Sequence, residues 1–358
     1  MPYGSLVTGQ MVAGLRRLGF TKVFDTNFAA DLTIVEEGSE LLRRIQTGGT
    51  LPMITSCSPG WIKYIEHEFP DQVSHLSTCK SPHMMLGALS KTFYAEQIGV
   101  QPEDIYVVSV MPCTAKKYEV TRPEMFIDGR PSVDAVLTTR ELARMIKDAG
   151  IEFTSLEDGG FDNPLGYSTG AADIFGATGG VMEAALRTVY EVVTGREVPF
   201  RHLDITPVRG LEQVKEADIL IEDAKPEFAF LNGVTVRVAV TSGLAGARIL
   251  MRQIADGSSP YHFIEVMGCP GGCISGGGQP RPTNRAIREA RMRAIYAEDA
   301  GKEQRKSHEN PYILRLYEAF LGEPLGHKSH ELLHTHYVPR GRYNQFLEEA
   351  KDEEIVKA

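Results

Sequence analysis

Five cysteines are the residues of this 358-residue chain whose type and spacing could support the most distinctive chemistry. Two of them, Cys269 and Cys273, are separated by three residues within a stretch at 267–280 that is too rich in Gly and Pro to form regular structure. Glycine lets a backbone lie close to a bulky object, and paired thiolates bind zinc, copper or an iron–sulfur cluster. Because one loop cannot complete a four-ligand site, we expect further ligands elsewhere in the chain.

Two further loops carry a cysteine in the same setting. An apolar run that is typical of a strand precedes each of Cys57, Cys113 and Cys269, and these runs lie at 51–54, 105–110 and 263–266. Parallel strands of an α/β sheet deliver ligands to a crevice beyond their carboxyl ends. A lone cysteine more often packs as a small hydrophobic residue, which is our interpretation of Cys79. Four cysteines in strand-end loops, in contrast, predict a buried metal–sulfur site.

The composition indicates a globular protein, because 42% of the residues are hydrophobic and 24% are charged. The length suffices for one large or two ordinary domains. A formal net charge of −9 argues against general binding to nucleic acid. No apolar run approaches the ~20 residues that cross a bilayer and no signal peptide is present, so we expect no membrane partner. The expected compartment is the reducing cytoplasm, or an organelle stroma after removal of a transit peptide.

Strand and helix patterns alternate along the sequence around the cysteine loops. This alternation predicts an α/β fold that positions the loops. Helices are predicted at 11–18, 39–46, 181–187, 213–218 and 283–297. Strands are predicted at 22–25 and 236–241, in addition to the three runs before the cysteines. No internal repeat and no linker divides the chain into independent domains.

The three cysteine loops resemble the signature motifs of the [FeFe]-hydrogenase catalytic domain, as found in small algal and clostridial enzymes. The family motifs read TSCCPxW, MPCxxKxxE and ExMACxxGCxxGGGxP, and here they lie at 55–61, 111–119 and 265–280. The likeness also includes 175–187, 307–311, 321–327 and 331–337. The resemblance implies two lobes of mostly parallel twisted sheet flanked by helices, with the metal cluster in the crevice between them. It implies a catalytic domain at 1–342 and leaves a charged tail at 343–358.

The cofactor of that family is the H-cluster, a [4Fe–4S] cluster bridged by a cysteine to a diiron subsite that carries CO, cyanide and azadithiolate ligands. The resemblance therefore implies an oxidoreductase of anaerobic metabolism, a ferredoxin hydrogenase that reversibly reduces protons to H₂. It also implies two kinds of partner, a ferredoxin-type electron carrier that docks on a local basic patch and maturation proteins that supply the diiron subsite.

The motif match assigns cofactor contacts residue by residue. Cys113, Cys269 and Cys273 match cluster ligands, with Cys273 in the bridging position. Lys116 matches a residue that contacts a cyanide ligand, where a buried anion needs a charge-assisted donor. The alternative interpretation of Lys116 is an ordinary surface lysine. The apolar residues expected to keep water from the cluster are Met111, Pro112, Phe175 and Met267.

The resemblance also implies a proton relay to the buried iron. The family relay passes through Cys, Glu, Ser, Glu and Arg, which match Cys57, Glu37, Ser77, Glu40 and Arg44. Glu37, Glu40 and Arg44 are spaced i, i+3 and i+7, so a helix would place them along one face. The same spacing is typical of a solvated charge stripe, which is the preferred interpretation without the motif match.

The chain departs from the family pattern in the first loop, where the usual cysteine pair is replaced by Cys57-Ser58. Ser58 occupies the [4Fe–4S] ligand position by register, yet a hydroxyl is far harder to deprotonate than a thiol of pKa ~8.5. Either Ser58 binds iron as an alkoxide, or Cys57 moves in as the ligand and Ser58 takes over near the relay. We expect Cys57 to be the ligand, because soft iron selects thiolate.

Two smaller departures concern the start of the chain and His83. The strand and short loop that usually precede the first helix of the domain are missing, which predicts a sheet one strand short and one open wall of the site. His83 stands where the family pattern more often has Gln.

Three other functions compete with a hydrogenase. A hydrogenase-like iron–sulfur assembly protein would lack the full lysine motif and the Gly-rich third loop, both of which are present here. A sensory hydrogenase with little H₂ turnover would typically carry an extra sensor domain. A plain zinc site would not require Lys116 or the register of the relay.

Overall fold

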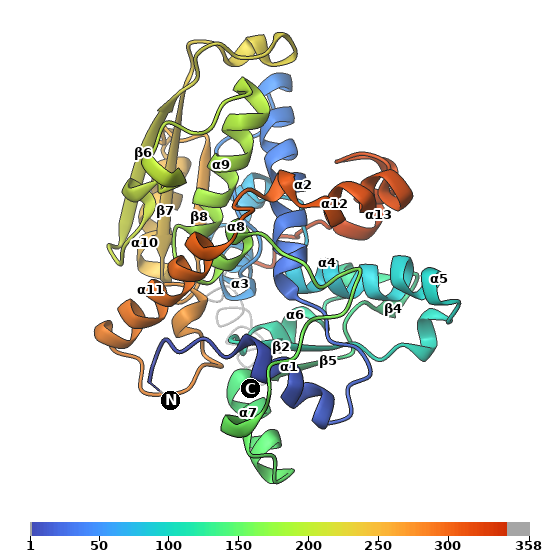
Figure 1. Ribbon diagram of the computed structural model, residues 1–358. Coiled ribbons are helices and arrows are strands. Elements are labelled where there is room, and N and C mark those ends of the chain that lie inside the picture. Colours follow the sequence, from blue (N-terminus) through green and yellow to red (C-terminus); the bar gives the residue numbers. More distant parts are fainter. Residues whose placement is uncertain (1, 342–358) are drawn as a thin grey trace, which may run out of the picture.

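The computed structural model describes residues 2–341, which form two lobes around one long central helix (Figure 1). This helix, α2 (Thr26–Thr47), begins at Asp25, whose carboxylate accepts a hydrogen bond from the N–H of Asn27. It ends at Gly48 in the left-handed conformation, so both of its ends are capped. It packs against α9 (Gly180–Thr194) of the larger lobe and against α4 (Pro82–Leu89) of the smaller lobe.

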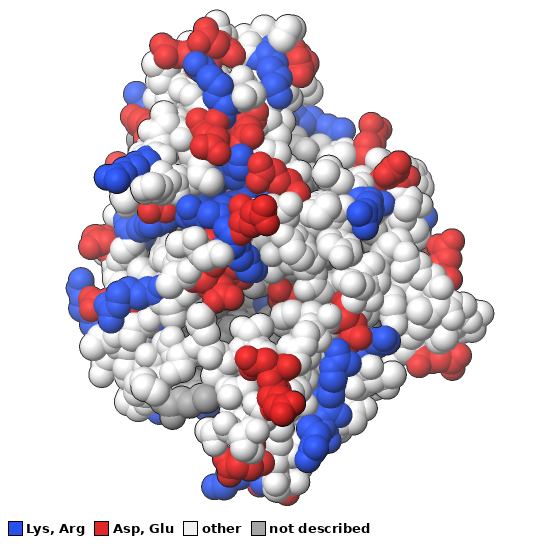
Figure 2. Space-filling model, in the orientation of Figure 1, with Lys and Arg blue, Asp and Glu red and all other residues white. Residues whose placement is uncertain are grey.

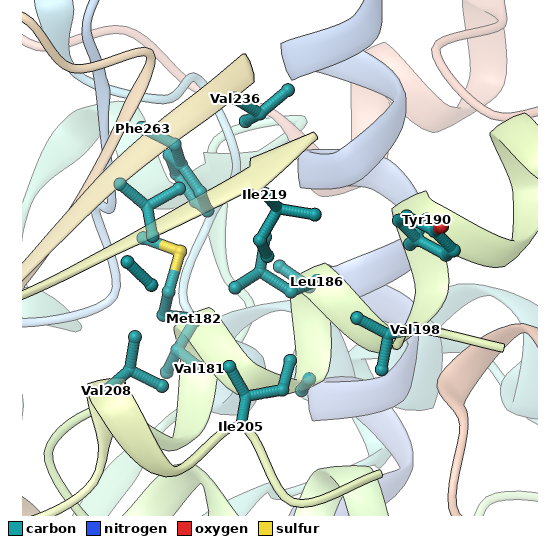
Figure 3. Packing of buried hydrophobic residues seen from close by; sticks show 14 of the residues in the cluster. Val181, Met182, Leu186, Tyr190, Val198, Ile205, Val208, Ile219, Val236 and Phe263 are labelled. Atoms are coloured by element: carbon teal, nitrogen blue, oxygen red, sulfur yellow. The ribbon is translucent and has the colours of Figure 1, made fainter. Parts of the chain in front are cut away.

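The larger lobe is built on a four-stranded sheet with the order β1-β8-β7-β6. Its strands are β1 (Met53–Ile54), β8 (Phe263–Met267), β7 (Thr235–Ser242) and β6 (Val214–Leu220). The first three run parallel, and β6 runs antiparallel to β7. Alternate residues of β1, β7 and β8 enter two different apolar clusters, so both faces of the sheet are buried at these three strands. One cluster lies against α9 (Figure 3), and the other lies against α3 (Pro59–Glu68) and α10 (Leu244–Ala255).

The smaller lobe contains a two-stranded parallel sheet of β2 (Val108–Met111) and β5 (Ala135–Thr138). The helix α7 (Thr139–Asp148) follows β5 and begins in a capping box, in which the side chains of Thr138 and Glu141 bond each other's backbone N–H. The other short elements of this lobe are α6 (Lys116–Glu119), β3 (Phe126–Ile127) and β4 (Arg130–Pro131).

The remaining α-helices surround these sheets and the central helix. They are α1 (Thr8–Arg17), α5 (Ala95–Ile98), α8 (Gly170–Asp173), α11 (Arg285–Gly301), α12 (Pro311–Leu316) and α13 (His327–Leu333). In the folded chain, α11 packs against α8, and α13 packs against α4. Within residues 2–341, no helix is long and apolar enough to cross a membrane.

The expected α/β fold with two lobes of mostly parallel sheet is confirmed. The apolar runs before the cysteines are the strands β1, β2 and β8, although β2 belongs to the second sheet. The helices expected at 11–18, 39–46, 181–187 and 283–297 lie within or overlap α1, α2, α9 and α11. The expected tail at 343–358 lies outside the described residues.

Two predicted elements are wrong. The segment 213–218 is not a helix but most of β6, whose side chains are alternately buried and exposed. Lys215 hides this alternation, because its buried ammonium donates to the carbonyls of Thr178 at 3.2 Å and Gly210 at 3.1 Å. The segment 22–25 is extended but forms no strand, since the N–H of Val23 donates to the Asp162 carboxylate instead.

Candidate metal centre

The three cysteine loops begin where strands end, and they meet in one cavity of about 1090 Å³. Cys57 follows β1, Cys113 follows β2, and Cys269 and Cys273 follow β8. All four cysteines line the cavity and are partly exposed, and Ser58 lines it beside them. The loops come from both lobes, so the cavity lies where the lobes meet.

Glycines allow the loop after β8 to pack directly on the loop after β2. The N–H of Gly278 donates to the Pro112 carbonyl at 2.9 Å. A Cβ atom at Gly276 would collide with the same carbonyl, and one at Gly278 would lie 3.0 Å from the backbone nitrogen of Cys113. These glycines are therefore required by the contact between two loops, and this contact brings Cys113 and Cys273 to one cavity.

The arrangement of the thiols fits a cluster better than a single ion. Burial raises the pKa values of Cys57, Cys269 and Cys273, that of Cys273 to about 12, so these groups are neutral thiols unless a metal binds them. A tetrahedral zinc site with Zn–S bonds of about 2.3 Å would bring its sulfur atoms within about 3.8 Å of each other. In the described part of the chain, no three of the four cavity sulfur atoms lie within 4.8 Å of one another.

Cys57 and Ser58 have different neighbours in the cavity. The Ser58 hydroxyl accepts a hydrogen bond from the N–H of Gly268 at 3.0 Å, beside Cys269. The Cys57 thiol lies close to Glu37, Lys116 and Cys273, whose charges act on its pKa. Cys57 therefore lies on the side of the predicted relay, and Ser58 lies on the side of the third cysteine loop.

Lys116 is buried, so its interpretation as an ordinary surface lysine is wrong. Its Nζ donates to Glu119 Oε2 at 2.8 Å and to the Cys57 carbonyl at 3.1 Å. The same Glu119 oxygen lies 2.7 Å from Nε2 of His83, whose Nδ1 lies 2.9 Å from the Ser109 hydroxyl. Although burial opposes ionisation, Lys116 and His83 lower the pKa of Glu119 to about 2. The lysine is thus held as a cation that faces the cavity.

Sequence reasoning missed the bracing roles of His83, Glu119 and Glu265. Glu265 is fully buried in β8, where its carboxylate accepts hydrogen bonds from the N–H groups of Gly179 at 2.6 Å and Met182 at 2.7 Å. It therefore caps the N-terminus of α9, the helix that follows the turn carrying Phe175. The available signal was a carboxylate inside an otherwise apolar strand. The four predicted apolar wall residues all line the cavity: Met111, Pro112, Phe175 and Met267.

The predicted relay residues beyond Cys57 form a buried chain. Ser77 donates to Glu40 Oε2 at 2.9 Å and also lies within hydrogen-bonding reach of Glu37. Arg44 donates to Glu40 Oε1 at 2.6 Å, and its side chain is 13% exposed, so it forms the outer end. Glu37 and Glu40 are buried, which excludes a solvated charge stripe. Burial and the charge of Glu40 raise the pKa of Glu37 to about 8, so this carboxyl holds a proton at neutral pH.

The cavity extends along β2 toward α1, beyond the cysteines. Residues 105–111 line it, and among the described residues β2 pairs only with β5.

The residues present fit an H-cluster. Three thiols and a fourth donor at Cys57-Ser58 can hold a [4Fe–4S] cluster, and Lys116 can pair with an anionic ligand. The glycine loops leave room for a bulky group, and Met111, Pro112, Phe175 and Met267 give the cavity an apolar wall.

Comparisons with known proteins agree with this geometry. Residues 1–277 match the family described as iron only hydrogenase large subunit, C-terminal domain, and residues 285–340 match the iron hydrogenase small subunit. The NADP-reducing hydrogenase subunit HndD of Solidesulfovibrio fructosivorans is 53% identical over 346 residues, which are 95% of this chain and 57% of that protein. Protein NAR1 of Arabidopsis thaliana is 30% identical over 351 residues, which are 91% of this chain and 71% of that protein.

A solved structure of apo [FeFe]-hydrogenase HydA1 from Chlamydomonas reinhardtii is 46% identical and superposes with a TM-score of 0.83, covering 94% of this chain and 89% of that one. The chain spans less than two thirds of the length of the curated hydrogenase relatives that it matches. Because the large-subunit family matches residues 1–277 of 358 and the solved fold covers almost the whole chain, this protein belongs to the iron-only hydrogenase family.

Proposed function

We propose that this chain catalyses the reversible reduction of protons to H₂ at an H-cluster. The observation that carries the proposal is the convergence of Cys57, Cys113, Cys269, Cys273 and Lys116 on one cavity, from which a buried acid chain leads outward. When bound, the H-cluster supplies the redox-active iron at which protons and electrons combine.

The protein residues hold this group and deliver protons to it. Cys113, Cys269 and Cys273 would hold the [4Fe–4S] cluster, with Cys273 at the position that the family motif assigns to the link with the diiron subsite. The Lys116 ammonium, fixed by Glu119, binds an anionic cyanide ligand, which would otherwise be a buried unpaired charge. The glycine-lined loops hold the group close, while the apolar wall keeps the iron from bulk water.

Protons move between solvent and the cavity in short steps along a series of hydrogen-bonded side chains. Arg44 holds Glu40 Oε1, Ser77 donates to Glu40 Oε2, and Ser77 in turn reaches Glu37. Because the pKa of Glu37 is raised to about 8, this carboxyl can both hold and release a proton near neutral pH. Cys57, close to Glu37, is the inner end of the relay. Its position supports Ser58 rather than Cys57 as the fourth cluster ligand.

Electrons enter the [4Fe–4S] cluster from a ferredoxin-type carrier in the cytoplasm, or in an organelle stroma, and maturation proteins supply the diiron subsite. On the face seen in Figure 2 acidic and basic side chains are interspersed, and a short line of basic side chains runs over the region of α1. Arg16 and Arg17 lie in the last turn of α1, and Arg16 pairs with Asp162. This line of basic side chains is the surface, on the face shown in Figure 2, where docking of the electron carrier should be tested.

An iron–sulfur assembly function is the second candidate, because Protein NAR1 is similar over most of the chain. The buried Lys116–Glu119 pair favours the hydrogenase. A protein that needs only a [4Fe–4S] cluster has no use for a cation fixed on the cavity wall.

Infrared spectroscopy of the protein matured with its accessory proteins tests the proposal. We expect CO and cyanide bands, together with H₂ evolution when reduced ferredoxin is supplied. Cys273→Ala should lose the bands, whereas Cys79→Ala, which changes a cysteine outside the cavity, should retain them. A matured protein without such bands, with its [4Fe–4S] cluster present, would instead support the assembly function.

A further inference from the structure

A second group of metal-ligating side chains lies at the relay, outside the cavity. Glu40, Cys79 and His334 each offer one ligand atom, and these three atoms lie within 4.8 Å of one another. All three side chains are buried, and none of them lines the cavity. Carboxylate, thiolate and imidazole are the donors that zinc prefers.

The fold brings these residues together from three distant segments. Glu40 comes from α2, and Cys79 follows the relay residue Ser77. Cys79 forms an isolated antiparallel bridge with His334, so the backbone fixes both side chains relative to each other. The Cys79 thiol lies 4.0 Å from Glu40 Oε2, the same oxygen that accepts the hydrogen bond from Ser77.

The imidazole of His334 is oriented as in a metal-bound histidine. Its Nε2 lies 3.0 Å from Glu36 Oε2, and Glu36 is itself held by the Tyr317 hydroxyl at 2.5 Å and the Leu325 N–H at 2.8 Å. A carboxylate that accepts a hydrogen bond from one ring N–H leaves the lone pair of the other ring nitrogen available for a cation. That other nitrogen, Nδ1, is 2.8 Å from the Thr78 hydroxyl, which can rotate away.

We propose that Glu40, Cys79 and His334 form a binding site for a borderline divalent cation such as Zn²⁺, and that the bound cation closes the proton relay. Zinc bonds of about 2.0–2.3 Å place neighbouring ligand atoms about 3.3–3.6 Å apart, so the 4.0 Å between Cys79 and Glu40 must shorten only slightly. The second part of the proposal rests on the proposed hydrogenase function.

Binding exchanges one proton for the cation. The Cys79 thiol loses its proton to solvent and its sulfur bonds to zinc, while Glu40 Oε2 and His334 Nδ1 donate lone pairs; no electron is transferred. Because Glu40 Oε2 then faces the metal, Ser77 loses its acceptor and the relay is broken. The exposed ring of His330 stacks on His334 with 4.4 Å between centroids and marks the route to solvent.

Zinc K-edge absorption spectroscopy on the [4Fe–4S]-loaded protein tests the site, with one equivalent of zinc sulfate added. We expect one sulfur ligand at about 2.3 Å with nitrogen and oxygen making up the rest. In Cys79→Ala the sulfur contribution should vanish, and zinc affinity should fall by about 100-fold or more, since even residues behind the ligands change affinity 10–100-fold. Glu191→Gln alters the partly exposed Glu191, His308 and Glu309 group and should leave the spectrum unchanged.

Zinc bound only by nitrogen and oxygen, or bound with three or more sulfurs as in the main cavity, would overturn the site. H₂ evolution by the matured protein tests the closure separately. Zinc should inhibit the wild type at concentrations about 100-fold lower than those needed for Cys79→Ala, each measured against its own zinc-free rate. Equal inhibition of both proteins would overturn the closure. A matured protein with no zinc-free turnover would contradict the proposed function, while the absorption spectrum would still decide the zinc site.

Discussion

Cys57 and Ser58 are adjacent in the chain, yet they lie against different parts of the site. Ser58 is bound to the N–H of Gly268, whereas the Cys57 thiol is close to Glu37 and Cys273. A thiolate is the better iron ligand, which led sequence reasoning to favour Cys57. The local contacts favour Ser58 instead, because ligation by Cys57 would withdraw the thiol from the relay that ends at Glu37.

Substitutions in the first loop separate the two assignments. After anaerobic reconstitution, Cys57→Ala should keep its [4Fe–4S] cluster but lower H₂ turnover of the matured protein by about 10²–10⁴-fold, the usual contribution of a positioned proton donor. Ser58→Ala should lose cluster iron, and Ser58→Cys should increase its retention. Iron content per chain and electron paramagnetic resonance measure these outcomes. Cluster loss in Cys57→Ala alone would make Cys57 the ligand.

The raised pKa of Glu37 makes stability depend on pH. The folded protein keeps this proton up to about pH 8, whereas the carboxyl has an ordinary pKa of 4.5. Between these values the folded state binds one more proton than the unfolded state, so stability falls as pH rises. Glu37→Gln removes this loss of stability, which is at most about 1.4 kcal/mol per pH unit. Its melting temperature should therefore exceed that of the wild type by a margin that grows from about pH 5 to about pH 8.

The control for this measurement is Glu227→Gln, which alters a carboxylate at an exposed position. It should shift the melting temperature by the same small amount at every pH. A constant difference between Glu37→Gln and the wild type across the same range would contradict the buried, protonated state of Glu37.

Loops and short strands, rather than long helices, position the side chains of the site. The apolar runs before Cys57, Cys113 and Cys269 predicted β1, β2 and β8 correctly, because short, mostly apolar runs rich in β-branched and aromatic residues are typical of buried strands. The segment that forms β6 was mistaken for a helix, since its inward-facing Lys215 breaks the apolar alternation. Hydrophobic pattern reveals buried strands, but it cannot recognise a long charged side chain whose ammonium finds buried carbonyls.

Gly276→Ala should disturb the site through this loop packing. The new Cβ would collide with the Pro112 carbonyl, so the loops that carry Cys113 and Cys273 must separate. We expect a loss of stability of about 1–3 kcal/mol, as for overpacked cores, and a lower cluster content. Gly60→Ala in α3 is the matched control, since a Cβ there meets nothing within 4 Å. It should stabilise the protein by about 0.4–1 kcal/mol. Equal iron content in all three proteins would contradict the tight loop contact.

Over the whole molecule, sequence motifs predicted which residues meet, but not what braces them. The meeting of Cys57, Cys113, Cys269, Cys273 and Lys116 at one cavity was predicted because each of them lies in a short motif. The contacts of Glu119 with His83 and of Glu265 with Gly179 join segments 36 and 86 residues apart. The trio of Glu40, Cys79 and His334 also joins segments that are distant in the chain. Such long-range pairings depend on the packing of the lobes. A single sequence can mark a residue such as Glu265 as unusual, because a carboxylate lies in an apolar strand, but it does not identify the partner.

The same long-range packing ties the two family regions of the chain together. Arg187 of α9 lies in the large-subunit region, and Asp299 of α11 lies in the small-subunit region. Both side chains are fully buried, and the guanidinium donates to both carboxylate oxygens at 2.9 Å. Arg305 and Glu183 complete the network, with Arg305 binding the same carboxylate and Glu183 lying 2.6 Å from Arg187. This network joins the two regions on either side of the mostly exposed connection at 281–284, so we expect the regions to stay together without the connection.

Cleavage at a protease site engineered into 281–284 should therefore leave both pieces associated in size-exclusion chromatography. Removing one partner of a buried ion pair costs about 3–5 kcal/mol, because the other charge stays buried and unpaired. Asp299→Ala should thus lower the melting temperature of the uncut chain and release the smaller piece after cleavage. Arg285→Ala removes an exposed pair with Glu289 and should change stability by less than about 0.5 kcal/mol. Separation of the cleaved pieces with Asp299 intact would show that the buried network alone cannot hold the two regions.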